Sequence, residues 1–372
     1  MNASLNERLR NVKWGEFKLG DLFEVVSYKK CFDANKVAII ENRGHPYIVR
    51  QSTENGRKGN IDEPIKYLNP GNTISFGQDT ATMFYQEKPY FTGDKIKILR
   101  PKYAKFGKNN AQFFLSTMRK AFCSFAWGSS RFNVETLKKQ MVSLPIKNNG
   151  YIDFDFMESF IAELEAERVA ELSAYLTVSG LDNYELSSEE MAIIEHYKKN
   201  QIPFSEFEFI EIFNNIKQGR RLKKEDQRPG HIPFVMSGIT NTGVVGYISN
   251  PVAKFPKNSI TVDIFGNSFF RNYDFGAGDD TGVYWNTKRE YSQTCMLFFA
   301  AAMESALRGK YSYGKKLRSS QSTHFKMQLP TKDGKPDYDA MDTLISAVQK
   351  LVIKDVVAYS NRKIKATKAV VK

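Results

Sequence analysis

The sequence has little of what membrane-spanning, secreted or disulfide-bonded proteins need. Its 372 residues contain no apolar run of about 18, so no transmembrane helix is expected. The N-terminal segment MNASLNERLRNVKW lacks the apolar region of a secretory signal. The three cysteines (Cys31, Cys123 and Cys295) are far apart and odd in number, which favours free thiols in a reducing compartment. These absences predict a cytoplasmic protein.

Motifs for catalysis and cofactor binding are also missing. The four histidines are scattered, and no Cys/His spacing resembles a zinc site. An adenine methyltransferase needs an Asn-Pro-Pro-aromatic or Asp-Pro-Pro-aromatic loop, but every proline here is isolated from other prolines. Neither GxGxxG nor GxxxxGK[ST] occurs, and the glycines between Phe275 and Asp280 predict a turn between strands. We therefore expect no catalytic residue, no metal and no cofactor in this chain.

What the sequence does have is an uneven distribution of charge. The net charge is +13, with a pI near 9.3. Residues 151–199 hold twelve acidic and three basic residues, a net charge of −9, which leaves +22 for the rest of the chain. This segregation predicts basic lobes that bind a polyanion, separated by a segment that avoids it.

An internal repeat organises the chain. The segment HPYIVRQSTENGRKGNID from His45 matches HIPFVMSGITNTGVVGYIS from His231, and pairs such as Gly56/Gly243 share an offset of 187. Further on, NNGYIDFDFMESFI matches KDGKPDYDAMDTLI at an offset of 184. A period this long is not that of a solenoid. It predicts two copies of one unit, each a domain followed by a helix.

The predicted helices carry a repeated apolar stripe. Its spacing is typical of one face of an amphipathic helix, and only Arg168 interrupts it. The stripe comprises Met157, Ile161, Leu164, Leu172 and Tyr175 in the first copy, and Met341, Ile345, Val348, Val352, Val356 and Tyr359 in the second. The simplest partner for each helix is the other one. Residues 155–176 would form roughly 33 Å of helix, close to the ~34–36 Å of one turn of DNA.

The fold class predicted is α+β, with two tandem, pseudo-symmetric, mixed α/β domains separated by long spacer helices. Asn72–Phe76 and Ser259–Phe265 have the composition of buried strands, and Asn109–Phe125 and Ser292–Leu307 that of helices. We assign residues 1–150 to the first domain, 151–200 to a helical spacer with a connector, 201–335 to the second domain, and 336–372 to a second helical spacer.

Two local patterns add a family resemblance. Phe17 to Glu24 reads Phe-Lys-Leu-Gly-Asp-Leu-Phe-Glu, and each copy closes on an aromatic-Gly pair and a Leu-Pro before its helix: Trp127-Gly128 with Leu144-Pro145, and Tyr313-Gly314 with Leu329-Pro330. With the domain–helix–domain–helix order, the chain resembles the specificity subunit of type I restriction–modification systems, or the related subunit of type IIB-like systems. The short, acidic first spacer, followed by SGLDNYEL, favours the type IIB-like branch.

The resemblance implies a subunit without activity of its own. Each target-recognition domain would read half of a split site in double-stranded DNA. The spacer helices would pack antiparallel and dock methyltransferase and endonuclease subunits. These partners would supply S-adenosylmethionine, Mg²⁺ and, in type I systems, ATP.

Polar loops at matching points of the two copies are the candidate DNA contacts, because base edges and phosphates are bound by polar and cationic groups. In the first copy they are Arg50, Gln51, Ser52, Asn55, Arg57, Lys58, Gln78, Ser129, Ser130 and Arg131. In the second they are Ser237, Thr240, Asn241, Asn267, Arg271, Lys315, Lys316, Arg318 and Gln321. The first loop of copy one is charged and its counterpart nearly uncharged, so we expect two different half-sites.

Three other functions stay open. A nuclease acting alone on DNA would use a pattern such as Glu16-Phe17-Lys18, but the second copy has Glu206-Phe207-Glu208. A duplicated carbohydrate-binding module would use the aromatic residues as platforms, although the +22 charge disfavours it. An RNA-binding protein would stack unpaired bases on those aromatic side chains.

Overall fold

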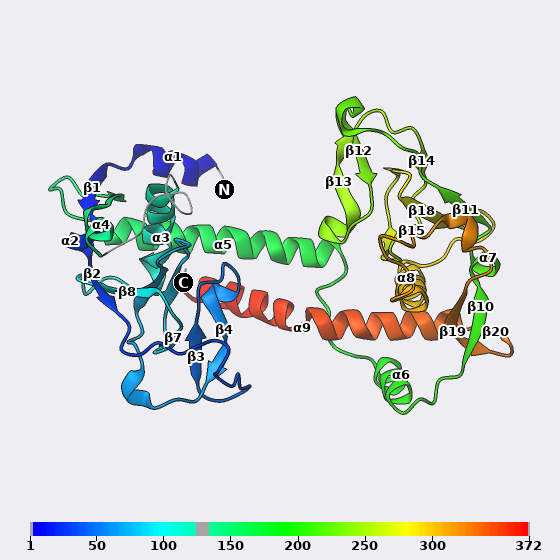
Figure 1. Ribbon diagram of the computed structural model, residues 1–372, viewed down its shortest axis with the longest axis horizontal. Helices are drawn as coiled ribbons and strands as arrows, with labels where there is room; N and C mark the ends of the chain where they lie inside the picture. Colours follow the sequence, from blue (N-terminus) through cyan, green and yellow to red (C-terminus); the bar gives the residue numbers. More distant parts are fainter. Residues whose placement is uncertain (1–2, 124–133, 371–372) are drawn as a thin grey trace. The chain divides into compact units, whose positions relative to one another are not determined.

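The computed structural model describes residues 3–123 and 134–370, with side chains up to residue 367. It divides into two compact units (Figure 1). Unit 1 contains the residues up to Leu172 and the end of the chain from Arg362, and unit 2 contains Ser173–Asn361. Each unit is a mixed α/β domain with part of a long helix, as the repeat predicts.

Unit 1 contains three antiparallel or mixed sheets. Its two-stranded sheet pairs β1 (Trp14–Lys18) with β9 (Met141–Pro145). The four-stranded sheet has the order β2 (Phe23–Ser27), β8 (Ile96–Pro101), β5 (Thr73–Gly77) and β6 (Met83–Gln86). The third sheet has the order β4 (Arg57–Ile61), β3 (His45–Ile48) and β7 (Phe91–Thr92). The helices are α1 (Ala3–Asn11), α2 (Leu19–Leu22), α3 (Lys108–Phe122) and α4 (Val134–Lys139), with short 3₁₀ turns at Glu54–Gly56 and Ile65–Tyr67.

Unit 2 repeats this plan strand for strand. Its three-stranded sheet has the order β10 (Phe204–Glu208), β19 (Lys326–Lys332) and β20 (Lys335–Pro336). The central sheet has the order β11 (Asn215–Gln218), β18 (Thr281–Trp285), β15 (Ser259–Asp263) and β16 (Ser268–Arg271). The third sheet has the order β13 (Val244–Ile248), β12 (Pro229–Val235), β17 (Phe275–Ala277) and β14 (Lys254–Phe255). Its helices are α6 (Ser188–Lys198), α7 (Phe209–Ile212) and α8 (Gln293–Leu307), with 3₁₀ turns at Lys224–Asp226, Thr240–Gly243 and Ser319–Gln321. Strands β14 and β20 are additions. The predicted duplication is thus confirmed.

The predicted central strands and helices form the two cores. Every residue of β5 and of β15 is buried. Each central sheet packs against one helix, α3 or α8, through matching phenyl rings, Phe114 and Phe299. Phe114 meets Phe23 edge-on at 5.7 Å, and Phe299 meets Phe213 at 5.6 Å. Such edge-to-face pairs add to the stability that burial of the rings provides.

The two long helices are α5 (Phe154–Val178), of 25 residues, and α9 (Tyr338–Val370), of 33. An aspartate caps each in the same way. The Asp153 carboxylate accepts a hydrogen bond from the Phe156 amide, and that of Asp337 accepts one from the Ala340 amide, both at 3.0 Å. These bonds satisfy amides that a helix leaves unpaired in its first turn. The helix starts are therefore part of the repeat.

The predicted stripe is right at the start of each helix and wrong further along. Met157 and Met341 are fully buried. Tyr175, however, is 64% exposed and Val352 is 75% exposed. Val348, Val356 and Tyr359 are also exposed, whereas Val169, Leu176, Leu344, Ala347 and Val357 are buried. The buried face is shifted because the first turns are fixed by each domain's own core.

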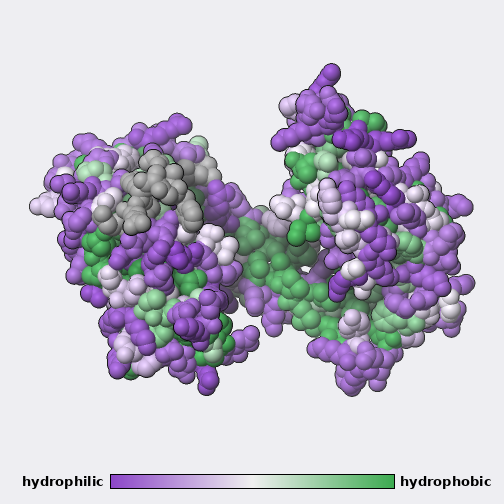
Figure 2. Space-filling model, viewed as in Figure 1, coloured by the Kyte–Doolittle hydropathy of each residue, from purple (hydrophilic) through white to green (hydrophobic). Residues whose placement is uncertain are grey.

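The misassigned positions leave an apolar face open on α9. Leu351 is exposed together with Val348, Val352, Val356 and Tyr359. Figure 2 shows hydrophobic surface gathered over the long helices, whereas the domain surfaces are largely hydrophilic. Packing of the two helices along their whole length stays a prediction. Within unit 1, Lys363 near the end of α9 forms an ion pair of 2.6 Å with Glu165 of α5.

Candidate nucleic-acid interface

A left-handed turn recurs in the loops that follow β3 and β12. Asn55 and Gly56 have φ angles of 55° and 75°, and their counterparts Thr242 and Gly243 have 51° and 84°. Glycine adopts this conformation freely and asparagine tolerates it, but a β-branched threonine does so only when its surroundings hold it. The polar loops predicted to read DNA are therefore built on one shared backbone geometry.

One side chain in each unit holds this turn from the neighbouring sheet. The Nε2 of Gln86, the last residue of β6, donates to the Asn55 carbonyl at 3.2 Å and to Ser75 Oγ at 3.0 Å. Arg271 ends β16 in the same position. It donates to Thr261 Oγ1 at 2.9 Å, to Thr242 Oγ1 at 2.9 Å, and to the Thr242 carbonyl. We name this duplicated arrangement the loop clip.

The loop clip corrects the prediction for Arg271. This residue is only 1% exposed, and burial lowers the pKa of its guanidinium. Its donors are directed at Thr242, Thr261 and the Tyr273 hydroxyl, inside unit 2. Arg271 is therefore a positioning residue for the loop and not a DNA contact. Gln86 and Thr261 were not predicted, because their role is visible only when the two copies are aligned in space.

A carboxylate ties two of the predicted regions together in each unit. In unit 1, Asp79 forms ion pairs with Arg50 at 2.7 Å and Lys95 at 2.8 Å. In unit 2, Asp263 is 4% exposed and accepts hydrogen bonds from Ser237 Oγ at 3.1 Å and Asn267 Nδ2 at 2.8 Å. The predicted contacts Ser237 and Asn267, from different loops, thus lie side by side. The carboxylate is therefore bound by cationic side chains in unit 1 and by neutral side chains in unit 2.

The third predicted region of unit 2 lies next to the same loops. The Leu317 amide donates to the Ile264 carbonyl at 2.9 Å, and the Ile264 amide donates to the Asp280 carbonyl at 3.0 Å. Arg318 Nη1 donates to the Asp279 carbonyl at 2.7 Å. Lys315, Lys316 and Gln321 are exposed on this segment. Three polar loops of unit 2 therefore converge on one edge.

Several of the remaining predicted residues make hydrogen bonds within unit 1. Gln51 Nε2 donates to the Arg57 carbonyl at 2.8 Å, Asn55 Nδ2 to the Tyr85 carbonyl at 3.1 Å, and Lys58 Nζ to the Ala34 carbonyl at 3.0 Å. Ser52, Thr240 and Asn241 are exposed, and Gln78 is half-buried. Ser129, Ser130 and Arg131 lie outside the described residues. Every charged side chain in the first loop is exposed or half-buried, so the charge contrast between the units is real at the surface.

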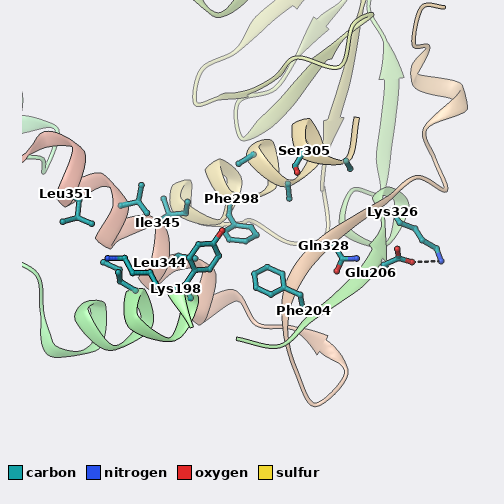
Figure 3. Close-up of a pocket in the computed structure, with 16 residues that line it drawn as sticks. Lys198, Phe204, Glu206, Phe298, Ser305, Lys326, Gln328, Leu344, Ile345 and Leu351 are labelled. Atoms are coloured by element: carbon teal, nitrogen blue, oxygen red, sulfur yellow. Dashed lines mark hydrogen bonds and ion pairs between the residues drawn. The ribbon is translucent and has the colours of Figure 1, made fainter. Parts of the chain in front are cut away.

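A separate apolar groove lies on the other side of helix α8 in unit 2 (Figure 3). Its volume is about 700 Å³, and Phe298, Ala302, Leu344 and Ile345 line it. Unit 1 has a groove of about 620 Å³ at the matching place, lined by Trp14, Thr117 and Ala121 among others. We name these the α8 groove and the α3 groove.

The two grooves differ in how far they extend along the long helix, because the helices that precede the first strands of the two units, α1 and α6, contact the long helices at different points. In unit 1, Leu5 of α1 enters the core, and Arg8 donates to Glu163 and, at 2.9 Å, to Ser159 of α5. In unit 2, Glu190 of α6 binds Ser346 at 2.6 Å and Lys350 at 2.8 Å. These contacts lie about one turn further along α9, so the α8 groove extends onto α9.

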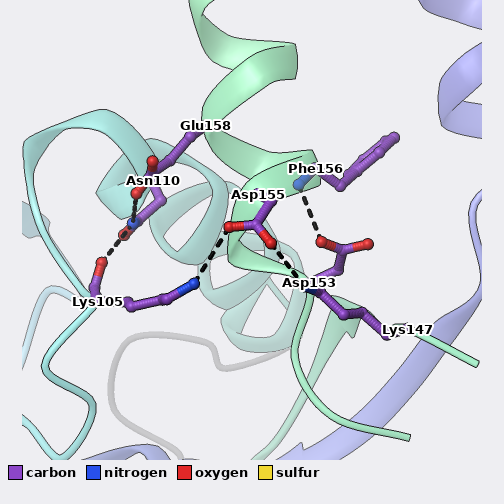
Figure 4. Close-up of polar contacts among 7 residues, drawn as sticks. All are labelled: Lys105, Asn110, Lys147, Asp153, Asp155, Phe156 and Glu158. Atoms are coloured by element: carbon purple, nitrogen blue, oxygen red, sulfur yellow. Dashed lines mark hydrogen bonds and ion pairs between the residues drawn. The ribbon is translucent and has the colours of Figure 1, made fainter. Parts of the chain in front are cut away.

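Charged and amide side chains hold the N-terminal turns of α5 in place (Figure 4). Asp155 binds Lys147 and, at 3.2 Å, Lys105, and these hydrogen bonds hold the pKa of its carboxyl below the usual value. Asn110 Nδ2 donates to Glu158 Oε1 at 3.0 Å. The counterpart of Glu158 is Asp342, which accepts a bond of 2.6 Å from Thr294. Each long helix is thus fixed to the start of α3 or α8.

Among the described residues, no three His, Cys, Asp or Glu side chains cluster closely enough to hold a metal ion. All three cysteines are free, and burial raises the pKa of the Cys295 thiol to about 12, which leaves it protonated. No helix in the described part of the chain is long and apolar enough to cross a membrane.

Comparison with known proteins gives a consistent result. The family model of the type I restriction modification DNA specificity domain matches residues 11–174 and 202–357. The type II restriction enzyme BgcI specificity subunit S.BcgI of Heyndrickxia coagulans is 29% identical over 349 residues, covering 92% of this chain and 96% of that protein. The crystal structure of a type I restriction–modification S subunit from M. genitalium is 15% identical, with a TM-score of 0.60 over 97% of this chain and 94% of its own. That structure shares the fold.

Proposed function

The chain belongs to the family of type I restriction–modification DNA specificity domains and is the specificity subunit of a restriction–modification system, and we propose that each unit reads one half of a split DNA target. One observation carries this proposal. Both units place polar loops of different chemistry on the same clipped backbone, charged in unit 1 and neutral in unit 2. A shared scaffold with different contacts is what two different half-sites require.

Mapping the modified DNA sites of the assembled system tests the proposal. The chain is co-expressed with a methyltransferase subunit that co-purifies with it, and methylated positions are determined by sequencing. We expect two short sequences separated by several unread base pairs. Replacing Ser237 and Asn241 by alanine should alter one of these sequences and leave the other unchanged. A continuous target, or a change in both sequences, would contradict the division between the units.

We infer that catalysis belongs to partner subunits. The specificity subunit S.BcgI, which this chain resembles over most of its length, is named as a specificity subunit and not as the catalytic part of its enzyme. A methyltransferase and an endonuclease would bind S-adenosylmethionine, Mg²⁺ and, in a type I system, ATP. The complex would act on DNA in the cytoplasm. Purified chain incubated with DNA and Mg²⁺ should leave the DNA intact, and cleavage would favour a nuclease instead.

For the partner we propose docking at the α8 and α3 grooves, with the open face of α9 extending the first. The occupant would be an amphipathic helix of the methyltransferase subunit. Unit 1 supports this, since α1 already fills the space beside α5 with Leu5 and a basic residue, Arg8. The unpartnered apolar residues Val348 and Leu351 line the corresponding space in unit 2.

A charge placed in the groove tests the docking site. Ala301 lines the α8 groove and is exposed, so Ala301→Glu should fold normally and weaken binding of the methyltransferase subunit. Gln293→Glu, at an exposed position on the same helix and outside the groove lining, is the matched control. Binding is measured by co-purification and titration calorimetry. Equal binding by the two variants would show that the partner docks elsewhere.

A further inference from the structure

A basic groove in unit 2 is lined by cations that, apart from Arg318, are not among the predicted DNA contacts. Its volume is about 870 Å³, and four cationic side chains line it together with Lys217: Arg220, Arg221, Lys254 and Arg318. Asp279 is the single acidic residue in this lining. Within the described chain, no hydrogen bond or ion pair engages the side chains of Arg220, Arg221 or Lys254, and all three are exposed. Several cations close together repel one another, which an anion in the groove would relieve.

The backbone beneath these cations is fixed. The Gly219 amide donates to the Thr281 carbonyl and the Arg220 amide to the Ala277 carbonyl, both at 2.9 Å. A Cβ on Gly219 would lie 2.1 Å from the Gly278 carbonyl oxygen, so only glycine allows this close approach. The two arginines therefore project from an ordered segment, which lowers the entropic cost of binding a ligand.

The groove adjoins the reading loops. The Gly278 amide donates to the Val235 carbonyl at 2.9 Å, one residue before the chain enters the loop at Met236. Arg318 and Asp279 of the groove are joined at 2.7 Å, and the neighbouring Asp280 carbonyl binds the loop that contains Asn267. Anything bound in the groove would thus lie beside a molecule held by the loops.

Unit 1 carries a basic pair at the matching position. Strands β2 and β11 pair with β8 and β18 in equivalent registers, and they end at Ser27 and Gln218. The second and third residues after these ends are Lys29-Lys30 and Arg220-Arg221. Lys30 lies over the rings of Phe32 and Tyr67, with its Nζ 4.8 Å and 4.7 Å from their centroids. The reading loops differ in charge between the units, yet this basic pair is retained in both.

From these observations we propose that Arg220 and Arg221, with Lys254 and Arg318 beside them, bind backbone phosphates of duplex DNA, and that Lys29 and Lys30 do so in unit 1. The inference rests on the proposed function. A contact retained where the base-reading loops differ must be independent of sequence, which is the property of phosphate contacts. The pair would set the distance and orientation at which each set of loops meets the base edges.

The salt dependence of DNA binding tests this site. The full chain is titrated with a 30-base-pair duplex of mixed sequence at several salt concentrations. Replacing Arg220 and Arg221 by alanine should weaken binding roughly 60-fold at about 0.1 M salt, because each lost phosphate contact lowers the slope of log K against log salt by ~0.9. The loss should be equal for duplexes of unrelated sequence. Arg220→Lys with Arg221→Lys keeps both charges and should retain the slope.

A matched control excludes a general effect of charge. Lys223 and Lys224 are exposed, lie in the same segment and are outside the groove lining, so their replacement by alanine should change the slope far less. An unchanged slope in the Arg220/Arg221 variant, or a loss confined to one DNA sequence, would overturn the inference. Melting curves check that both variants fold. If the wild-type complex has no split target, the proposed function fails, while the salt dependence still reports on the groove.

Discussion

The loops after β3 and β12 occupy the same place in the two units and differ almost completely in side-chain chemistry. Arg50 is ion-paired to Asp79, whereas its counterpart Ser237 donates a hydrogen bond to Asp263. The turn beneath them keeps its left-handed backbone, and a side chain from the adjacent strand holds it in both cases. Backbone geometry is thus retained while the contacting groups change. This separates the residues that place the loops from those that read DNA.

The largest effect in this comparison should come from the loop clip. Arg271→Ala removes a buried guanidinium and leaves Thr242 and Thr261 without their donors, so we expect unit 2 to lose on the order of 3 kcal/mol of unfolding free energy. Gln86→Ala in unit 1 should cost about 1–2 kcal/mol, because a neutral amide makes fewer bonds. Denaturant unfolding measures both values. Recognition of only the unit 2 half-site should be lost with Arg271→Ala.

Giving unit 2 the glutamine that unit 1 has in its loop clip tests whether the two clips are equivalent. Arg271→Gln gives unit 2 the side chain that unit 1 uses, opposite Thr261 instead of Ser75. We expect it to restore part of the stability lost in Arg271→Ala, since the amide still reaches a hydroxyl and a carbonyl. If glutamine were as destabilising as alanine, the two clips would not be equivalent.

Replacing the loop carboxylates, Asp263 in unit 2 and Asp79 in unit 1, should change the unfolding free energy by smaller amounts than loss of the Arg271 clip. Asp263 is 4% exposed and accepts bonds from several loop groups, so Asp263→Asn should cost about 2 kcal/mol and loosen Ser237 and Asn267. Asp79 is one-third exposed, and its ion pairs with Arg50 and Lys95 are screened by solvent, so Asp79→Asn should cost less than about 1 kcal/mol. Raising the salt concentration should affect only the Asp79 pair. Equal losses at low salt would break the contrast.

The sequence predicts the duplication, the buried strands and the helices that pack on them, because these follow from order and hydrophobic period. It does not predict the burial of Arg271, because the contacts with Thr261 on the adjacent strand and with Thr242 in a separate loop depend on how these segments fold together. The helix stripe holds for Met157, Ile161, Leu164 and Met341 and fails at positions such as Tyr175 and Val352, because two overlapping apolar faces are present and the domain core selects one. The sequence also does not reveal that the basic pairs Lys29-Lys30 and Arg220-Arg221 correspond to each other, because they align through strand register and not through the offset of the neighbouring motifs.

The helices α1 and α6 precede the first strands of the two units, and the way each is attached gives the smallest expected effect. Burial raises the pKa of Glu190, but hydrogen bonds from Lys350, Ser346 and the Ser187 amide outweigh it and lower the pKa to about 2 from 4.5. A lowered pKa means that the carboxylate stabilises the fold fully above about pH 4.5, and that this contribution is lost as the pH falls toward 2. Glu190→Gln should therefore cost about 1–2 kcal/mol at neutral pH, with the difference from wild type shrinking across that window. Denaturant unfolding at a series of pH values measures this difference, and Glu189→Gln, an exposed neighbour on α6, is the control.

Because Arg8 of α1 makes its contacts at partly exposed side chains, Arg8→Gln should have a smaller effect in the same pH range. A difference between wild type and Glu190→Gln that stayed constant down to pH 2 would mean that α6 is held by its apolar face, as α1 is by Leu5, and not by its charge.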